Sequence, residues 1–254
     1  MSYDWSGRSQ QMQSNTQALV ALQKQIFIGG GLAFGYERLF EHEFGRRRTA
    51  TRSGTFFGPS SERSSVRKET YGFVEASPVK QLFFLGVVSY NWGSLDYDFG
   101  NGPKYPRVSR AFLETGTSQL DPGAGNLLYI ESSVRYQPTT ALQMQINYNR
   151  SRLTRNDTGR VAFDDNVLSF RSTYQFSRNV FARTRIDYSN IASRIRPQLV
   201  VGWTPSPGTA LYAGYNDDLN YRGFNPYTGI QEPGLRGNGR SFFIKASYLF
   251  RRSF

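Results

Sequence analysis

The only histidine of the chain, His42, lies between Glu41 and Glu43 in the segment EHEF. A histidine with neighbouring carboxylates can act as a general base, so these residues raise the hypothesis of a hydrolase site at the rim of a sheet. Neighbouring side chains of an extended strand point to opposite faces, which places both glutamates badly for orienting His42. No GxSxG nucleophile motif accompanies them. We therefore expect a solvated histidine at this position and no catalytic residue.

Basic side chains outnumber acidic ones by 31 to 19, which gives a net charge of +12. One group lies in a long polar segment and is expected at an outer rim, where it would pair with lipopolysaccharide phosphates: Arg46, Arg47, Arg48 and Arg52. A second group alternates with apolar residues and is expected to line a lumen: Arg135, Arg171, Arg183, Arg185 and Lys245. Such a lumen would favour anions. The alternative is a network of arginine, carboxylate and glutamine side chains that fills a narrow barrel.

The composition excludes several other classes of protein. There is no cysteine, so disulfides and thiolate metal sites are excluded, and no pattern predicts a metal or cofactor. The basic residues are dispersed and accompany no recognition motif, which argues against nucleic acid as a partner. Aromatic residues reach 15%, yet the mean hydropathy is −0.52 and no 18 apolar residues run together. This combination is typical of strands in which apolar and polar residues alternate.

Alternation with a period of two runs through almost the whole chain. In ALQMQINYNR (141–150), Leu142, Met144, Ile146 and Tyr148 alternate with glutamine and asparagine. We expect further strands near 9–22, 26–40, 68–76, 80–97, 126–136, 166–176, 179–189, 197–204, 209–219 and 240–251. Short turns at 23–24, 77–79, 137–140, 177–178 and 205–208 alternate with longer polar segments at 41–67, 98–125, 154–163, 190–196 and 220–239. These lengths favour an all-β, antiparallel up-and-down transmembrane β-barrel over a soluble sandwich or lipocalin-like barrel.

The strand count is odd. Eleven strands result if 98–125 is one long outer loop, whereas making RVSRAFLETGT (107–117) a twelfth strand puts short and long connections on the wrong rims. A single-chain bacterial barrel has an even number of strands. The start, MSYDWSGRSQ, also lacks the features of a signal peptide. We expect residues 1–254 to form a single β-barrel domain of about 11–12 strands that lacks upstream strands and a signal peptide, or that a partner chain completes.

The chain ends in SFFIKASYLFRRSF, which resembles the signal that the barrel-insertion machinery of bacterial outer membranes recognises, with a terminal Phe254. Four stretches resemble the C-terminal barrel of a bacterial family of unknown function: LDPGAG (120–125), YQFSRNVFARTRIDYSN (174–190), GWTPSPGTALYAGYND (202–217) and the final strand. Members of that family place a family-9-like carbohydrate-binding domain before a large barrel. The resemblance implies a Gram-negative outer-membrane protein associated with carbohydrate.

The expected function is passive. The leading hypothesis is a porin-like pore or a scaffold that anchors surface ligands, embedded in outer-membrane lipid and lipopolysaccharide. One alternative is a structural barrel subunit completed by a partner chain, because bare strand edges are costly in lipid. The other alternative is an outer-membrane hydrolase with a rim site near His42.

Overall fold

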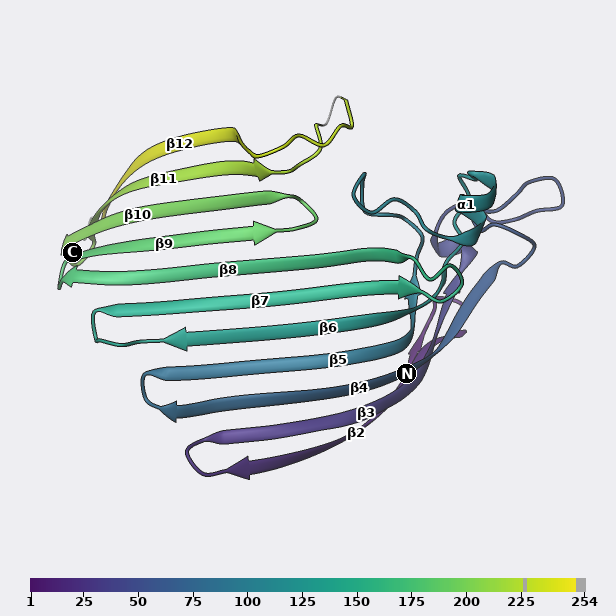
Figure 1. The fold of residues 1–254 in the computed structure, drawn as a ribbon, viewed down its shortest axis with the longest axis horizontal. Helices are drawn as coiled ribbons and strands as arrows, with labels where there is room; N and C mark the ends of the chain where they lie inside the picture. Colours follow the sequence, from purple (N-terminus) through teal and green to yellow (C-terminus); the bar gives the residue numbers. More distant parts are fainter. Residues whose placement is uncertain (226–227, 250–254) are drawn as a thin grey trace, which may run out of the picture.

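The computed structural model describes residues 1–225 and 228–249. It contains one twelve-stranded antiparallel sheet whose strands follow one another in chain order (Figure 1). The strands are β1 (Ser2–Tyr3), β2 (Ser9–Leu22), β3 (Ile26–Phe40), β4 (Glu62–Val79), β5 (Leu82–Asp96), β6 (Gly123–Tyr136), β7 (Leu142–Arg155), β8 (Val161–Ser177), β9 (Val180–Ser189), β10 (Arg194–Ser206), β11 (Thr209–Tyr221) and β12 (Leu235–Tyr248). The prediction of an all-β, antiparallel up-and-down fold is confirmed.

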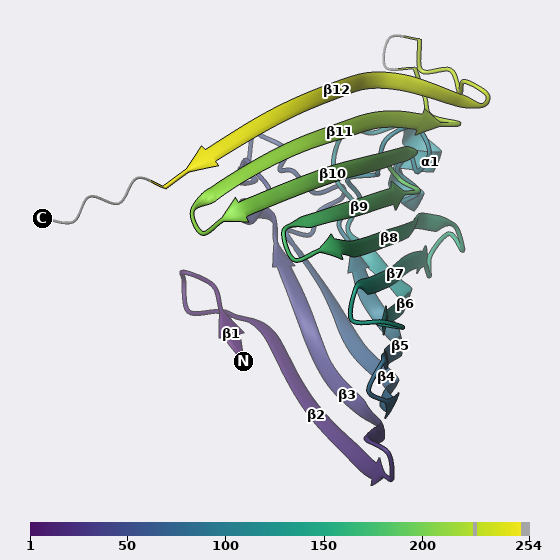
Figure 2. The same cartoon turned by 90° about the vertical axis from the view of Figure 1, so that its left-hand side faces the viewer.

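The two rims of the sheet differ as predicted (Figure 1). At the turn rim, connections of two to five residues join β2 to β3, β4 to β5, β6 to β7, β8 to β9 and β10 to β11. At the loop rim lie the longer connections 41–61, 97–122 and 222–234, and also the shorter ones 156–160 and 190–193. The sheet curves into a trough, and loops of the loop rim reach over its concave side (Figure 2).

Alternation divides each strand between the two faces of this trough. In β7 the face that carries Gln143, Gln145, Asn147 and Asn149 is the concave face, and the opposite set forms the convex face. Large exposed hydrophobic side chains concentrate on the convex face, including Phe34, Val66, Trp92, Ile146, Leu168, Leu199, Trp203, Leu211, Phe242 and Ile244. Cross-strand pairing keeps this division in register from β2 to β12. A soluble sheet would cover such a face, so the convex face is suited to an apolar surrounding.

Glycines on the concave face make room for aromatic rings of neighbouring strands. A Cβ atom on Gly202 would lie 2.4 Å from the ring of Phe181, and one on Gly214 would lie 2.2 Å from the ring of Phe243. Each glycine is paired directly with its aromatic partner across the strands. The rings lie flat over the backbone, which lets the sheet curve tightly at these positions.

Several predicted boundaries are wrong because the strands extend beyond the alternating core. β4 begins at Glu62 rather than near residue 68, and the expected long segments 154–163 and 190–196 shrink to 156–160 and 190–193. Residues 107–117 do not form a strand, in agreement with the preferred reading of 98–125 as one long loop. They contain the short helix α1 (Arg110–Thr115), whose N-cap Ser109 accepts a hydrogen bond from the Phe112 amide and whose C-cap Gly116 has a φ of 64°.

The sheet is open, because β2 and β12 do not meet. In the described part of the chain, β12 pairs with β11 alone, while the two residues of β1 cover only the loop-rim end of β2. Both β2 and β12 run from the loop rim to the turn rim. The expectations for residues 250–254, including Phe254, lie outside the described residues.

Among the residues that the structure describes, no helix has the length and hydropathy that a membrane-spanning helix requires.

Candidate functional site

A row of polar and basic side chains crosses the concave face near the middle of the strands. Each member stands directly opposite the next in the register of β6 to β11: Arg135, Gln145, Arg171, Arg185, Gln198 and Asn216. Directly opposed residues of antiparallel strands have Cβ atoms about 4.5–5.5 Å apart, so the row is continuous. The sheet thus brings together three of the five basic residues that the sequence assigned to a lumen.

Two arginines of this row oppose each other, namely Arg171 of β8 and Arg185 of β9. Like charges in this position destabilise a sheet. Arg185 is compensated by an ion pair of 2.6 Å with Asp187, which also accepts a hydrogen bond from Ser169. Arg171 is exposed and, among the described residues, has no hydrogen-bond or ion-pair partner. The middle of the row therefore carries an uncompensated positive charge.

The other two predicted lumen residues also lie on the concave face, closer to the turn rim. Arg183 stands opposite Thr173 and Val200, and its guanidinium lies 4.5 Å from the ring centroid of Phe181. Lys245 stands opposite Tyr212 on the edge strand β12. Neither residue belongs to the row, and neither approaches a carboxylate within ion-pair distance among the described residues. Both add positive charge to the same face.

Sequence reasoning missed Arg194 and Arg196, which lie on β10 beside the row. Together with Arg171, Arg185 and Glu131 they line a hollow of about 490 Å³ on the concave face. Arg196 is paired with Asp187 across the strands and lies 3.5 Å from Asp218. The alternation of Arg194, Arg196 and Gln198 was present in the sequence as a signal. Pro197, which is unusual inside a strand, obscured that signal.

Loops 41–61 and 97–122, which we call the mouth loops, join each other at the loop rim. The amide of Phe57 donates to the carbonyl of Leu120, and the amide of Leu120 donates to the carbonyl of Thr55, each at 2.8 Å. Phe56 is fully buried between them. On the concave face, the hydroxyl of Tyr97 donates to Glu37 at 3.0 Å. Burial, together with the charge of Glu37, raises the pKa of Tyr97 to about 12, so this donor keeps its proton.

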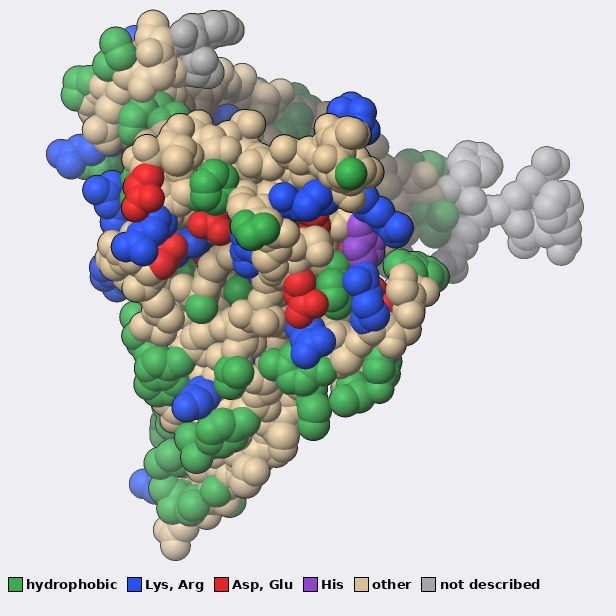
Figure 3. Space-filling model, turned by 90° about the vertical axis from the view of Figure 1, so that its right-hand side faces the viewer, with side chains coloured by type: hydrophobic (Ala, Val, Ile, Leu, Met, Phe, Trp, Pro, Cys, Tyr) green, Lys and Arg blue, Asp and Glu red, His purple; other side chains and the backbone are tan. Residues whose placement is uncertain are grey.

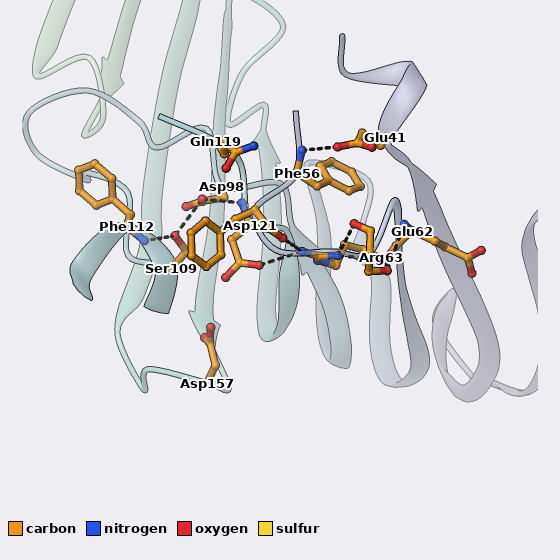
Figure 4. A network of polar contacts seen from close by, with 12 residues as sticks. Glu41, Phe56, Glu62, Arg63, Asp98, Ser109, Phe112, Gln119, Asp121 and Asp157 are labelled. Atoms are coloured by element: carbon orange, nitrogen blue, oxygen red, sulfur yellow. Dashed lines mark hydrogen bonds and ion pairs between the residues drawn. The ribbon is translucent and has the colours of Figure 1, made fainter. Parts of the chain in front are cut away.

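Buried charges hold the mouth loops in place (Figure 4). Asp98, with a φ of 62°, accepts hydrogen bonds from Arg107 (2.5 Å), Ser109 (2.8 Å) and the Asp121 amide (2.9 Å). Arg63 of β4 donates to the carbonyl of Phe57 at 2.6 Å, which ties the loops to the sheet. Such pairs add little net stability against an apolar replacement, but removing one partner is costly. They therefore specify one loop arrangement.

A second buried cation, Arg155 at the end of β7, reinforces this arrangement. It binds Asp157 through two hydrogen bonds of 2.9 and 2.8 Å, and it contacts Asp96 at 3.0 Å. Burial alone would raise the pKa of Asp157, but the hydrogen bond and the charge of Arg155 outweigh it and lower that pKa. The carboxylate therefore stays ionised and holds the loop end of β7.

The predicted rim arginines separate into two groups. Arg46, Arg47 and Arg52 are exposed at the loop rim. Figure 3 views this rim and shows lysine and arginine side chains interspersed with acidic ones around the mouth. Arg48 instead turns inward, where it contacts Glu41 at 3.3 Å and donates to the carbonyl of Phe56 at 2.8 Å. Arg48 thus braces the mouth loops, because the buried carboxylate of Glu41 requires a cation.

The geometry around His42 does not resemble a catalytic site. Residues 41–43 form a 3₁₀ turn in which Glu41 accepts the Phe56 amide and Glu43 accepts the Phe40 amide. Both carboxylates are thereby engaged with the backbone. The imidazole lies 3.3 Å from the guanidinium of Arg8, which carries no group that accepts a proton. Within residues 1–225 and 228–249, no carboxylate is hydrogen-bonded to His42 as a general base would require.

No protein-family model and no curated protein matches this chain, so the resemblance to a barrel with a carbohydrate-binding domain finds no support there. Several solved structures are similar. In vitro-folded OmpT, an outer membrane protein of Vibrio cholerae, is 12% identical, with 94% of this chain and 95% of that chain covered and a TM-score of 0.37. A Pseudomonas aeruginosa FadL homologue is 11% identical, with 94% and 67% covered and a TM-score of 0.32. The CymD monoaromatic hydrocarbon channel is 10% identical, with 95% and 74% covered and a TM-score of 0.30.

Proposed function

We propose that this chain forms the wall of a β-barrel in a bacterial outer membrane, and that its concave face conducts small anions. The division into an apolar convex face and a polar concave face supports this proposal, since lipid favours the first and a water-filled lumen the second. The loop rim then faces the outside of the cell. There the exposed Arg46, Arg47 and Arg52 are available to lipopolysaccharide phosphates.

The observation that carries the proposal is the direct opposition of Arg171 and Arg185. A row that only filled the barrel would separate its arginines by amides or carboxylates, as Gln145 separates Arg135 from Arg171, and would not place two arginines side by side. The opposed pair instead costs stability in the empty protein. An anion on the concave face would relieve that cost, and a weak site of this kind lets the ion leave again.

A conducting wall must also be closed. Because β2 and β12 run in the same direction, an antiparallel sheet can close between them only if an odd number of further strands lies between these two edges. β1 runs in the opposite direction but contributes only two residues. Unpaired backbone groups cost several kcal/mol each in hydrocarbon. The proposed barrel is therefore completed by strands additional to those described, from this protein or from a partner chain.

The test is the reversal potential in planar lipid bilayers under a potassium chloride gradient. Arg171→Gln removes an unpaired charge from the middle of the row, and Arg178→Gln removes an equal charge from the exposed turn between β8 and β9. We expect the wild type to prefer chloride, R171Q to lose part of that preference, and R178Q to behave as the wild type. An equal effect of both variants would contradict an anion pathway along the row.

The same recording distinguishes a pore from a scaffold that only presents ligands, the two functions between which the sequence did not decide. The buried contacts that tie the mouth loops together favour a rigid, ligand-presenting surface as the second candidate function. A protein that inserts into the bilayer without conducting would support this scaffold and refute the pore. We assign neither form a catalytic role, because the contacts of His42 include no orienting carboxylate.

A further inference from the structure

A cavity of about 300 Å³ lies beneath the second mouth loop and is separate from the arginine row. Its roof comes from the loop, through Phe99 and Val108. Its floor is formed by Leu127, Leu153 and Phe163 at the loop-rim ends of β6, β7 and β8. These strand residues point to the concave face, so the cavity lies between the mouth and the interior of the trough.

The walls of this cavity are mostly apolar. Val108, Leu153 and Ala162 form a buried cluster against which Leu127 and Phe163 pack. The cavity is partly open, so water can enter it, and a mainly apolar ligand would release that water from the apolar walls. Its volume is at the lower end of the range of sites that bind small molecules.

Two buried polar atoms give the cavity a specific chemistry. Ser94 is 7% exposed, and the register that pairs it with Gly125 places it on the same face as Leu127. Its hydroxyl has no hydrogen-bond partner among the described residues, and the Nε of Arg107 also has none. Both residues line the cavity. Buried polar atoms without partners are rare in native proteins, and each one costs about 1–3 kcal/mol.

The charges at the edge of the cavity are already neutralised. Arg107 is paired with Asp98 at 2.5 Å, and Asp96 is paired with Arg155 at 3.0 Å. An ionic ligand would therefore meet no net opposite charge and would lose its hydration. The two unpartnered atoms lie in the cavity wall but are closed off from its space, so the oxygen atom of an uncharged ligand would bond to them only after the Ser94 side chain rotates toward the cavity.

We propose that this cavity binds a small, uncharged and mainly apolar molecule that carries one hydroxyl or carbonyl group. A cavity of about 150 Å³ holds a benzene molecule, so about 300 Å³ accommodates one substituted ring or a chain of similar size. The ligand covers Leu127, Leu153 and Phe163 and directs its oxygen atom toward Ser94. This site does not depend on the proposed anion pathway, because it shares no residue with the arginine row.

The test is calorimetric titration of the full chain in lipid nanodiscs, with empty nanodiscs subtracted. The probes are p-cresol and toluene, which share a ring and a methyl group but differ in the hydroxyl. Ser94→Ala removes the proposed partner, and Ser133→Ala removes a hydroxyl from the same face, where Ser133 is bonded to Asn147. We expect saturable binding of p-cresol, weakened about three- to tenfold by S94A and unchanged by S133A. Toluene should bind equally to both variants.

A second variant keeps the proposal falsifiable if S94A disturbs the loop. Ala162→Met extends a flexible side chain from the cavity wall, so we expect it to abolish binding of both probes. Its chloride preference in bilayers should equal that of the wild type, which shows that the sheet is intact. The proposal is overturned if p-cresol does not bind saturably, or if S94A weakens toluene as much as p-cresol. Loss of anion preference in R171Q with unchanged p-cresol binding would show that the two sites are independent.

Discussion

Replacing Asp98 with asparagine should release the second mouth loop without unfolding the sheet. The side chain of Asp98 is completely buried and is paired with Arg107, which is itself 14% exposed. Asparagine has the same shape and tolerates the positive φ of 62° at this position, so the variant changes charge rather than backbone geometry. It leaves the guanidinium of Arg107 without a counter-charge in a buried environment.

The expected magnitude follows from the contacts that remain. Removing one partner of a buried ion pair costs about 3–5 kcal/mol. Arg107 keeps its hydrogen bonds to the carbonyls of Thr117 and Gln119. We therefore expect the free energy that holds the loop closed to fall by an amount at the lower end of this range, about 3 kcal/mol. At 1.4 kcal/mol per factor of ten, amides of the loop should exchange about a hundredfold faster.

The assay is hydrogen exchange with mass spectrometry on peptides from residues 113–121, with peptides of β6 and β7 as internal references. Arg110→Gln is the matched control, because its ion pair with Glu114 in the same loop is 67% and 66% exposed. Exposed pairs of this kind contribute little, so R110Q should change exchange by less than about threefold. Equal exchange in D98N and R110Q would refute the view that the buried pair holds the loop.

The remaining predictions concern the two faces, the glycine positions and pH. Ile146→Arg should destabilise the membrane-inserted protein by about 2–4 kcal/mol, whereas Asn147→Arg, one residue along on the concave face, should be tolerated; urea unfolding in lipid vesicles measures both. Gly202→Val should cost about 1–3 kcal/mol because its side chain meets the ring of Phe181, while Gly239→Ala, with nothing within 4 Å, should cost less in the same assay. The lowered pKa of Asp157 means that its contribution to stability is complete above its ordinary pKa of 3.8 and is lost as pH falls through the lowered value. The protection of residues 156–160 against hydrogen exchange, relative to the intrinsic rate at each pH, should therefore fall in strongly acidic solution, and Asp157→Asn should remove that loss of protection.

The strand order and the two faces could be predicted from the sequence because alternation is a local property. The pattern in 141–150 assigns each residue of β7 to one face, and the eleven expected segments correspond to β2 through β12. The five residues that were predicted to line a lumen all lie on the concave face for the same reason, namely Arg135, Arg171, Arg183, Arg185 and Lys245. The opposition of Arg171 and Arg185 requires the register, which the turn length between β8 and β9 determines.

The contacts of the mouth loops could not be predicted, because they form between irregular loop segments in which no periodic pattern indicates which residues meet. The role of Arg48 depends on the burial of Glu41 beneath Phe56, and nothing in the run of arginines at 46–48 distinguishes it from its neighbours. The cap signals around α1, Ser109 and Gly116, were present in the sequence, but the whole segment 98–125 was assigned to one loop. Asp98 and Arg107 are nine residues apart and pair only because the loop folds back on itself.

The most direct test of the account is a cysteine scan of β7. The chain contains no cysteine, so single substitutions from residue 142 to 149 provide the only thiols. The protein in lipid vesicles is treated with a charged, membrane-impermeant maleimide. The account predicts labelling at residues 143, 145, 147 and 149, and protection at residues 142, 144, 146 and 148. Uniform labelling at all eight positions, or labelling of the second set alone, would contradict a lipid-facing convex surface and a water-filled concave one.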